Sequence, residues 1–174
     1  MSILIDKARA FAIAAHSAVG QRRKYTGEPY WKHPADVVRL LRTVTDDQQI
    51  LAAAWLHDVV EDTQVDLSLI CRMFGSRVAE LVEMVTDVSK PEDGYRAARK
   101  AIDREHIAKA HPDAKTIKLA DLIDNSKSIL DRDPNFAKVY MKEKAALLAV
   151  LTEGDERLWN IAHGIVSAGL PKED

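Results

Sequence analysis

Long helix-forming segments, separated by a few proline, glycine and polar breakpoints, dominate this sequence. Apolar residues recur with helical spacing along most of the chain, and strand-like alternation of apolar and polar residues is scarce. Only seven glycines and six prolines occur in 174 residues, which is too few for a protein with many tight β-turns. We therefore predict an all-α fold and one domain over residues 1–174.

The breakpoints predict about eight or more helices. The expected ranges are 2–19, 34–43, 47–60, 66–73, 76–87, 93–109, 113–130, 135–152 and 155–168. Pro34 suits the first turn of its helix, and either Asp46 or Asp47 is expected to cap the helix over 47–60.

Composition limits the classes of function. Lys and Arg number 25 against 27 Asp and Glu, so the charge balance predicts no nucleic-acid polymer as a partner. The single cysteine, Cys71, cannot form an intrachain disulfide, which favours a reducing compartment. No apolar run approaches the roughly 18 residues that span a bilayer, and Asp6 interrupts the N-terminal apolar stretch. We expect a cytoplasmic protein with no membrane partner. If the chain assembles, we expect a homo-oligomer, because most soluble oligomers are symmetric assemblies of one chain.

The segment from Ile50 to Asp62 is the most informative part of the chain. Seven apolar residues lead directly into His57-Asp58, and two more apolar residues separate that pair from Glu61-Asp62. A helix that is apolar on most faces is normally buried, and burial of imidazole and carboxylate groups is costly without compensation. A bound cation would compensate them. Four solvated residues at a helix end are the alternative that this segment alone leaves open.

Two other places offer candidate metal ligands. His33 stands immediately before Pro34, at an expected helix start where a side chain can face a cleft. A polar stripe at helical spacing interrupts the apolar helix expected over 113–130, and its members are Asp121, Asp124, Asn125 and Ser128. A loop histidine and a solvated helix face are the respective alternatives.

Two histidines and two aspartates form a mixed nitrogen and oxygen donor set. Such a set suits Mn, Fe, Co, Ni or Zn better than Ca, and its lack of thiolates argues against a structural zinc site. A divalent ion lowers the pKa of water and polarises a phosphoryl oxygen. Glu61 and Asp62 follow one turn after the His-Asp pair and are suited to orient the water or carry its proton. Hydrolysis of a phosphate ester or anhydride is the reaction class that fits these residues.

A basic connector between the first two predicted helices is a candidate phosphate contact. Arg22, Arg23 and Lys24 stand beside Tyr25 and close in sequence to His33. Arginine binds phosphate with forked geometry, and lysine acts as a point charge. A solvated loop is the alternative for so short a basic run.

Three ordered motifs resemble the hydrolase domain of RelA/SpoT proteins. The first runs from Gln21 to Pro34 and includes Gly-Glu-Pro-Tyr; the second, AAWLHDVVEDT, covers 53–63; the third, IKLADLIDN, covers 117–125. The resemblance extends from about residue 16 to 130. It is closest to the stand-alone small alarmone hydrolases, because the chain ends where a bifunctional member would continue into a synthetase domain.

The resemblance implies an HD-superfamily fold and a manganese-dependent enzyme of the stringent response. Such enzymes remove the 3′-pyrophosphate from guanosine 3′,5′-bispyrophosphate (ppGpp) or pppGpp and leave GDP or GTP and pyrophosphate. The implied ligands of one Mn²⁺ are His33, His57, Asp58 and Asp121. Glu61 and Asp62 would position and activate the water. The implied nucleotide contacts are Arg23, Lys24, Asn125, Ser128 and Tyr140.

Two departures from the family pattern touch the expected nucleotide pocket rather than the metal ligands. Larger members commonly have Arg-Leu-His-Asn after the metal-site aspartate, where this chain has Leu-Ile-Asp-Asn over 122–125. The stretch over 16–27 is also spaced differently. Adenosine alarmones (ppApp), the 2′-phosphate of NADPH and nucleoside monophosphates therefore stay open as substrates. A non-catalytic alarmone-binding domain is the alternative from another functional class.

Overall fold

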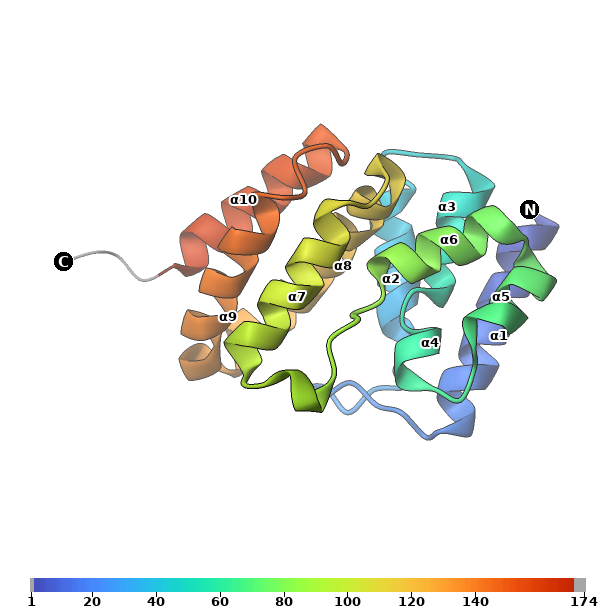
Figure 1. The fold of residues 1–174 in the computed structure, drawn as a ribbon, viewed down its shortest axis with the longest axis horizontal. Helices are drawn as coiled ribbons and strands as arrows, with labels where there is room; N and C mark the ends of the chain where they lie inside the picture. The colour runs from blue at the N-terminus through green and yellow to red at the C-terminus, as the bar shows by residue number, and fades with distance from the viewer. Residues whose placement is uncertain (1, 171–174) are drawn as a thin grey trace. The chain divides into compact units, whose positions relative to one another are not determined.

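A computed structural model describes residues 2–170, and helices make up its regular structure apart from one isolated β-bridge between Arg22 and Pro29 (Figure 1). The all-α prediction is confirmed. The ends of the predicted domain, Met1 and residues 171–174, lie outside the described residues. The chain divides into two compact units, which we call unit 1 (Met1–Thr86) and unit 2 (Asp87–Asp174).

Unit 1 is built around a short helix whose apolar residues are all buried. Its helices are α1 (Ile3–Ala18), α2 (Lys32–Leu41), α3 (Gln48–Leu56), α4 (Val59–Asp62), α5 (Leu67–Phe74) and α6 (Ser76–Val85). Helix α3 packs against α1, α2 and α6, and every residue from Ile50 to Leu56 is buried. The apolar run of the sequence is therefore the core of unit 1, and the residues that follow it begin inside the protein.

The single helix predicted over 47–60 is wrong, because α3 ends at Leu56 and α4 begins at Val59. At Asp58 the backbone angles are φ −99° and ψ −4°, away from the values of a regular α-helix. A new turn then starts where the N–H of Asp62 donates to the carbonyl of Asp58 at 2.9 Å. His57 and Asp58 consequently occupy a corner between two helices rather than one helical face.

Unit 2 is organised around its longest helix. Its elements are the 3-10 turn η1 (Pro91–Asp93), α7 (Arg96–Ala108), α8 (Pro112–Arg132), α9 (Pro134–Leu148) and α10 (Glu156–Gly169). Helix α8 packs against α9 and α10. Gly154, in the turn before α10, allows close approach, since a Cβ there would lie 2.8 Å from Leu119 Cδ1.

The remaining helix predictions agree with the structure to within a few residues. The largest differences are the late start of α7 at Arg96, after the separate turn η1, and the end of α9 at Leu148. Among residues 2–170, no helix combines the length and apolar character that a membrane span requires.

Asp47 is the N-cap of α3, which decides between the two predicted caps. Its Oδ1 accepts hydrogen bonds from the backbone N–H groups of Gln49 (2.8 Å) and Ile50 (3.2 Å). Replacing Asp47 with alanine should lower the free energy of unfolding by about 1 kcal/mol, measured by urea denaturation. The matched control is Asp46→Ala, because Asp46 is exposed and caps no helix. Equal losses in the two variants would contradict the capping role.

Candidate active site

Three predicted ligands of unit 1 converge at the corner between α3 and α4. Each of His33, His57 and Asp58 offers one ligand atom, and these atoms all lie within 4.8 Å of one another. The two histidine side chains are almost fully buried, whereas 16% of the Asp58 side chain is exposed. The group therefore faces solvent mainly at its carboxylate.

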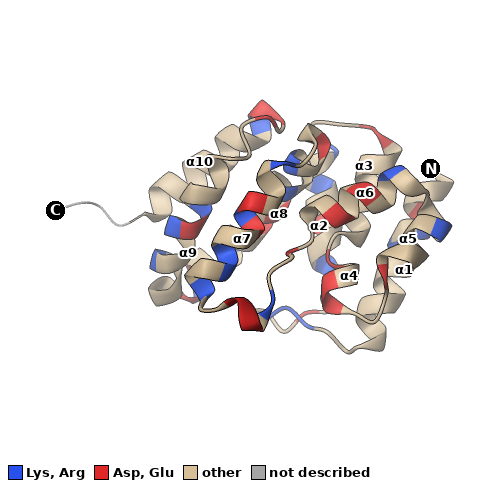
Figure 2. Cartoon of the chain, in the orientation of Figure 1, with Lys and Arg blue, Asp and Glu red and all other residues tan. Residues whose placement is uncertain are grey.

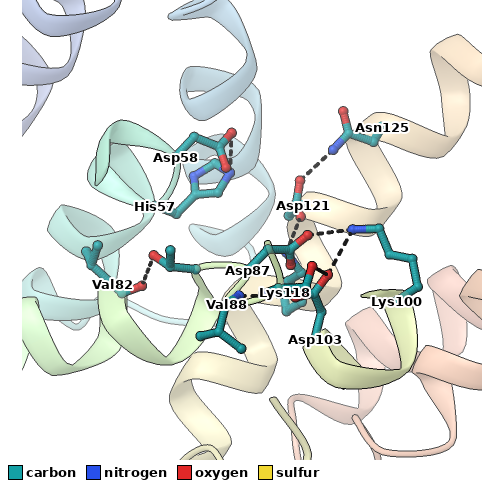
Figure 3. Close-up of polar contacts among 12 residues, drawn as sticks. His57, Asp58, Val82, Asp87, Val88, Lys100, Asp103, Lys118, Asp121 and Asn125 are labelled. Carbon is teal, nitrogen blue, oxygen red and sulfur yellow. Dashed lines mark hydrogen bonds and ion pairs between the residues drawn. The ribbon is translucent and has the colours of Figure 1, made fainter. Parts of the chain in front are cut away.

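The orientation of His57 suits a metal ligand. Its Nδ1 lies 2.8 Å from the carbonyl oxygen of Ala54, and because a carbonyl can only accept, the ring carries a proton on Nδ1. In the neutral ring the Nε2 lone pair then lies 3.0 Å from Asp58 Oδ2 (Figure 3). Two electron-rich atoms at this distance require a cation or a proton between them. The backbone carbonyl thus fixes the tautomer that a metal would need.

His33 completes the group from α2. Its Nε2 lies 3.5 Å from the same Asp58 Oδ2, and its ring meets that of His57 edge to face at 5.1 Å between centroids. Two imidazole nitrogens and one carboxylate oxygen fit a divalent transition metal, and they leave positions for other ligands. We conclude that these residues fit a divalent cation.

Tyr30 supports the group, and the sequence did not predict this. Its hydroxyl donates a hydrogen bond of 2.6 Å to Asp58 Oδ2. Its ring also packs edge to face on His33, with 5.7 Å between centroids. The signal available in the sequence was the position of Tyr30 in the Gly-Glu-Pro-Tyr motif, three residues before His33.

The acidic pair lies on α4, and part of this helix is red for Asp and Glu in Figure 2. Glu61 is exposed, and Asp62 accepts a hydrogen bond of 2.9 Å at Oδ2 from Gln21 Nε2. Much of Asp62 is exposed, but its carboxyl group is partly enclosed. This burial raises the pKa of Asp62, and the charge of Asp58 raises it further. A carboxylate with a raised pKa is a better proton acceptor.

The predicted basic contacts lie in the connector between α1 and α2. The backbone of Arg23 is fixed by hydrogen bonds with Glu28 (2.8 Å) and Gly27 (2.9 Å). The exposed Lys24 places its ammonium group over the ring of Tyr25, 4.9 Å from the centroid. The nucleotide-binding role of Arg23 and Lys24 stays a prediction.

The remaining predicted site residues lie in unit 2, on α8 and α9. Asp121 is buried, lies 3.3 Å from Lys118 Nζ and accepts a hydrogen bond of 2.6 Å from Asn125 Nδ2 (Figure 3). The hydroxyl of Ser128 donates to the carbonyl of Asn125 at 3.1 Å. Asn125 therefore orients Asp121. The ligand role of Asp121 and the substrate roles of Asn125 and Ser128 stay predictions.

A second ion-pair cluster lies beside α8 in unit 2. Lys100 Nζ lies 2.5 Å from Asp87 Oδ2 and 3.3 Å from Asp103 Oδ2 (Figure 3). Burial acts to raise the pKa of Asp87, but the charges of Lys118 and Lys100 outweigh it and lower that pKa. Asp103 also accepts from the backbone N–H groups of Val88 and Ser89. The cluster thus anchors the segment that leads into η1.

Tyr140 and Lys144 form a stacked pair on α9. Tyr140 is buried, and burial followed by the charge of Asp121 raises the pKa of its hydroxyl. The Lys144 ammonium group lies 4.7 Å from the centroid of the Tyr140 ring. Burial, followed by the charge of Lys118, lowers the pKa of Lys144 to about 8. The nucleotide contact expected of Tyr140 stays a prediction.

A family model described as an HD domain matches residues 8–154, so this chain belongs to the HD domain family. The probable guanosine-3′,5′-bis(diphosphate) 3′-pyrophosphohydrolase of Synechocystis sp. is 36% identical over 152 residues, which are 85% of this chain and 20% of that protein. The guanosine-3′,5′-bis(diphosphate) 3′-pyrophosphohydrolase of Aquifex aeolicus is 37% identical over 127 residues, or 72% of this chain and 18% of that protein. The chain thus spans about a fifth of these relatives' length.

One solved structure is similar to this chain along nearly the whole length of both chains. It is described as a metazoan ortholog of SpoT that hydrolyzes ppGpp and plays a role in starvation responses. The match has a TM-score of 0.85 at 28% identity and covers 97% of this chain and 96% of that one. These matches confirm the predicted HD-superfamily fold and the resemblance to the RelA/SpoT hydrolase domain.

Metal binding should stabilise the protein through the unit 1 ligands. A ligand that binds only the folded state at a hundredfold excess over its Kd adds about 2.7 kcal/mol to the free energy of unfolding. We expect Mn²⁺ to raise the melting temperature of the chelator-treated protein and Asp58→Asn to lose most of that rise, measured by scanning calorimetry. Asp36→Asn is the control, since Asp36 pairs with Arg39 instead. An undiminished rise in Asp58→Asn would contradict this assignment.

Lys144 should make stability depend on alkaline pH. Its pKa is about 8 in the folded protein against an ordinary 10.5, so between these values the unfolded chain binds more protons. The free energy of unfolding should therefore rise with pH in that window. Lys144→Met should be more stable than wild type near pH 7. Its free energy of unfolding, measured by urea denaturation, should not show this rise with pH. The exposed neighbour variant Lys142→Met should keep it, and an identical slope in all three proteins would contradict the assignment.

Proposed function

We propose that this protein is a metal-dependent hydrolase that removes the 3′-pyrophosphate from ppGpp and pppGpp. The observation that carries the proposal is the structural likeness, over 97% of this chain, to the metazoan ortholog of SpoT that hydrolyzes ppGpp. The pyrophosphohydrolase names of the Synechocystis and Aquifex relatives support the same substrate class. The convergence of His33, His57 and Asp58 supports the metal dependence.

The proposed metal is Mn²⁺, which the resemblance to the RelA/SpoT hydrolase domain implies and which is one of the transition metals that a mixed set of imidazole and carboxylate donors suits. The ligands that the family resemblance implies are His33, His57, Asp58 and Asp121. When bound, such an ion polarises a phosphoryl oxygen and lowers the pKa of water. Tyr30 and the carbonyl of Ala54 hold two of these ligands in orientation through the hydrogen bonds described above.

In the proposed reaction, a water oxygen bonds to the phosphorus attached to the 3′ oxygen, and the bond between that phosphorus and the 3′ oxygen breaks. The water loses a proton to the acidic pair Glu61 and Asp62, and the 3′ oxygen takes up a proton from solvent water and leaves as a hydroxyl. The products are pyrophosphate and GDP or GTP. The raised pKa of Asp62 supports its role as the proton acceptor.

The family resemblance implies which side chains would hold the nucleotide. Arg23 and Lys24 carry the charges suited to its phosphates. Asn125, Ser128 and Tyr140 would contact its ribose, base or phosphate side. We also propose a cytoplasmic location, in keeping with the single cysteine, and assembly as a homo-oligomer.

The test is pyrophosphate release in the presence of Mn²⁺ from ppGpp, ppApp and NADPH, with phosphate release followed in parallel. We expect turnover of ppGpp and its loss on chelation. Asp58→Ala should be inactive and so expose any contaminating activity. Glu61→Gln and Asp62→Asn should each lower kcat by about a hundredfold or more, the size typical of a lost general base.

Each substrate in the panel separates one alternative. Turnover of ppApp alone would assign an adenine-specific alarmone hydrolase, and phosphate release from NADPH alone would assign a 2′-phosphatase. Tight binding of ppGpp without turnover, with the metal bound, would indicate an alarmone-binding domain. Each of these three results would contradict the proposed activity.

A further inference from the structure

A histidine occupies a core position of α1. The buried positions of this helix are Ile5, Ala8, Ala12 and His16, which follow one helical face. His16 is 1% exposed, although three apolar side chains precede it on that face. Burial lowers the pKa of His16, so its ring is predominantly neutral. A buried imidazole at an apolar position requires a physical explanation.

The end of α1 brings Gln21 back over this histidine. The N–H of Gly20 donates to the carbonyl of Ser17 at 3.0 Å, and the N–H of Gln21 donates to the carbonyl of His16 at 3.1 Å. This is the pair of hydrogen bonds of a Schellman motif, and Gly20 takes the required positive φ of +64°. The chain therefore places the Gln21 side chain beside the His16 ring.

Gln21 links His16 to the acid of α4. Gln21 Nε2 donates to Asp62 Oδ2 at 2.9 Å, and Gln21 Oε1 lies 2.7 Å from His16 Nδ1. Because the amide oxygen can only accept, the His16 ring carries its proton on Nδ1 and donates it to Gln21. His16 thereby fixes which end of the Gln21 amide faces Asp62. Helix α1 also packs on α4, which brings the three residues together.

The same imidazole also supports the group formed by His33, His57 and Asp58, which we call the metal group. The His16 ring packs against the ring of Tyr30, with 4.9 Å between centroids, and Tyr30 donates to Asp58. His16, Gln21 and Tyr30 all line a pocket of about 220 Å³.

The second ring nitrogen of His16 contributes no hydrogen bond. His16 Nε2 is buried and has no hydrogen-bond partner among residues 2–170. Leaving such an acceptor buried and unsatisfied is destabilising. An apolar residue at this position would avoid that cost, so a role confined to packing does not explain the histidine. The bond from Nδ1 to Gln21 is the contact that an apolar residue could not supply.

We propose that His16 and Gln21 are positioning residues, which hold the Asp62 carboxylate in the orientation that accepts the proton of the attacking water. The inference rests on the proposed function, because it takes Asp62 as part of the acidic pair. His16 donates to Gln21, Gln21 donates to Asp62, and neither residue needs to touch the substrate. Outer partners of this kind typically change activity by about tenfold to a hundredfold.

The first test removes the donor to Asp62. Gln21→Met keeps the length of the side chain, so kcat with ppGpp and Mn²⁺ should fall about tenfold to a hundredfold while KM and metal affinity stay unchanged. Because the Gln21 hydrogen bond lowers the pKa of Asp62, that pKa should rise in Gln21→Met, measured on the metal-free protein by carbon-13 NMR of the carboxyl group. The control is Gln64→Met, the same change at an exposed glutamine close to the acidic pair.

The second test compares two amide substitutions of His16. In His16→Asn the amide nitrogen takes the place of Nδ1 and can still donate to Gln21, whereas His16→Gln extends the amide toward the Nε2 position. We expect His16→Asn to retain more of the wild-type kcat than His16→Gln. Melting temperatures of both variants separate lost activity from lost folding.

The outcomes distinguish this inference from the proposed function. If wild type is active, Asp62→Asn is inactive and Gln21→Met matches wild type in kcat and in the pKa of Asp62, the positioning role is overturned and the function stands. If wild type hydrolyses no alarmone, the proposed function fails. The pKa of Asp62 in Gln21→Met then still tests the hydrogen bonds that run from His16 through Gln21 to Asp62. Full activity of Asp62→Asn would overturn the positioning role as well.

Discussion

Burial of His57 at the end of an apolar helix is the constraint on which the site depends. Helix α3 is enclosed by α1, α2 and α6, so the residues that follow it start inside the protein. An imidazole and a carboxylate at that place need compensation. The Ala54 carbonyl satisfies one ring nitrogen of His57, and Tyr30 satisfies part of Asp58. A divalent cation would balance what remains, which explains why the core of unit 1 ends in polar residues.

The metal group could be predicted from sequence because its members break strong patterns. His57 and Asp58 interrupt an apolar run, and His33 stands before the proline of a helix start. The corner between α3 and α4 could not be predicted, because apolar periodicity continues through it to Val60. The break depends on the backbone angles at Asp58, which no local residue preference determines.

The support behind the acidic pair was hidden for a different reason. His16 lies on the apolar face of α1, and Gln21 opens the motif over 21–34, in which only the basic residues and His33 were expected to contact a ligand. Neither residue type at that spacing signals a ligand or a catalytic group. Their function depends on a helix end that turns Gln21 back over His16 and on α4 packing beside α1. Such contacts arise from tertiary structure, so sequence patterns describe the ligands better than the groups that orient them.

We propose that one divalent cation binds at the corner between α3 and α4. The most direct measurement is anomalous scattering at the manganese edge from crystals of the Mn²⁺-loaded protein. We expect one strong peak in contact with His33 Nε2, His57 Nε2 and the carboxylate of Asp58. A manganese peak bound elsewhere, with these three side chains engaged only with one another in an active enzyme, would contradict it.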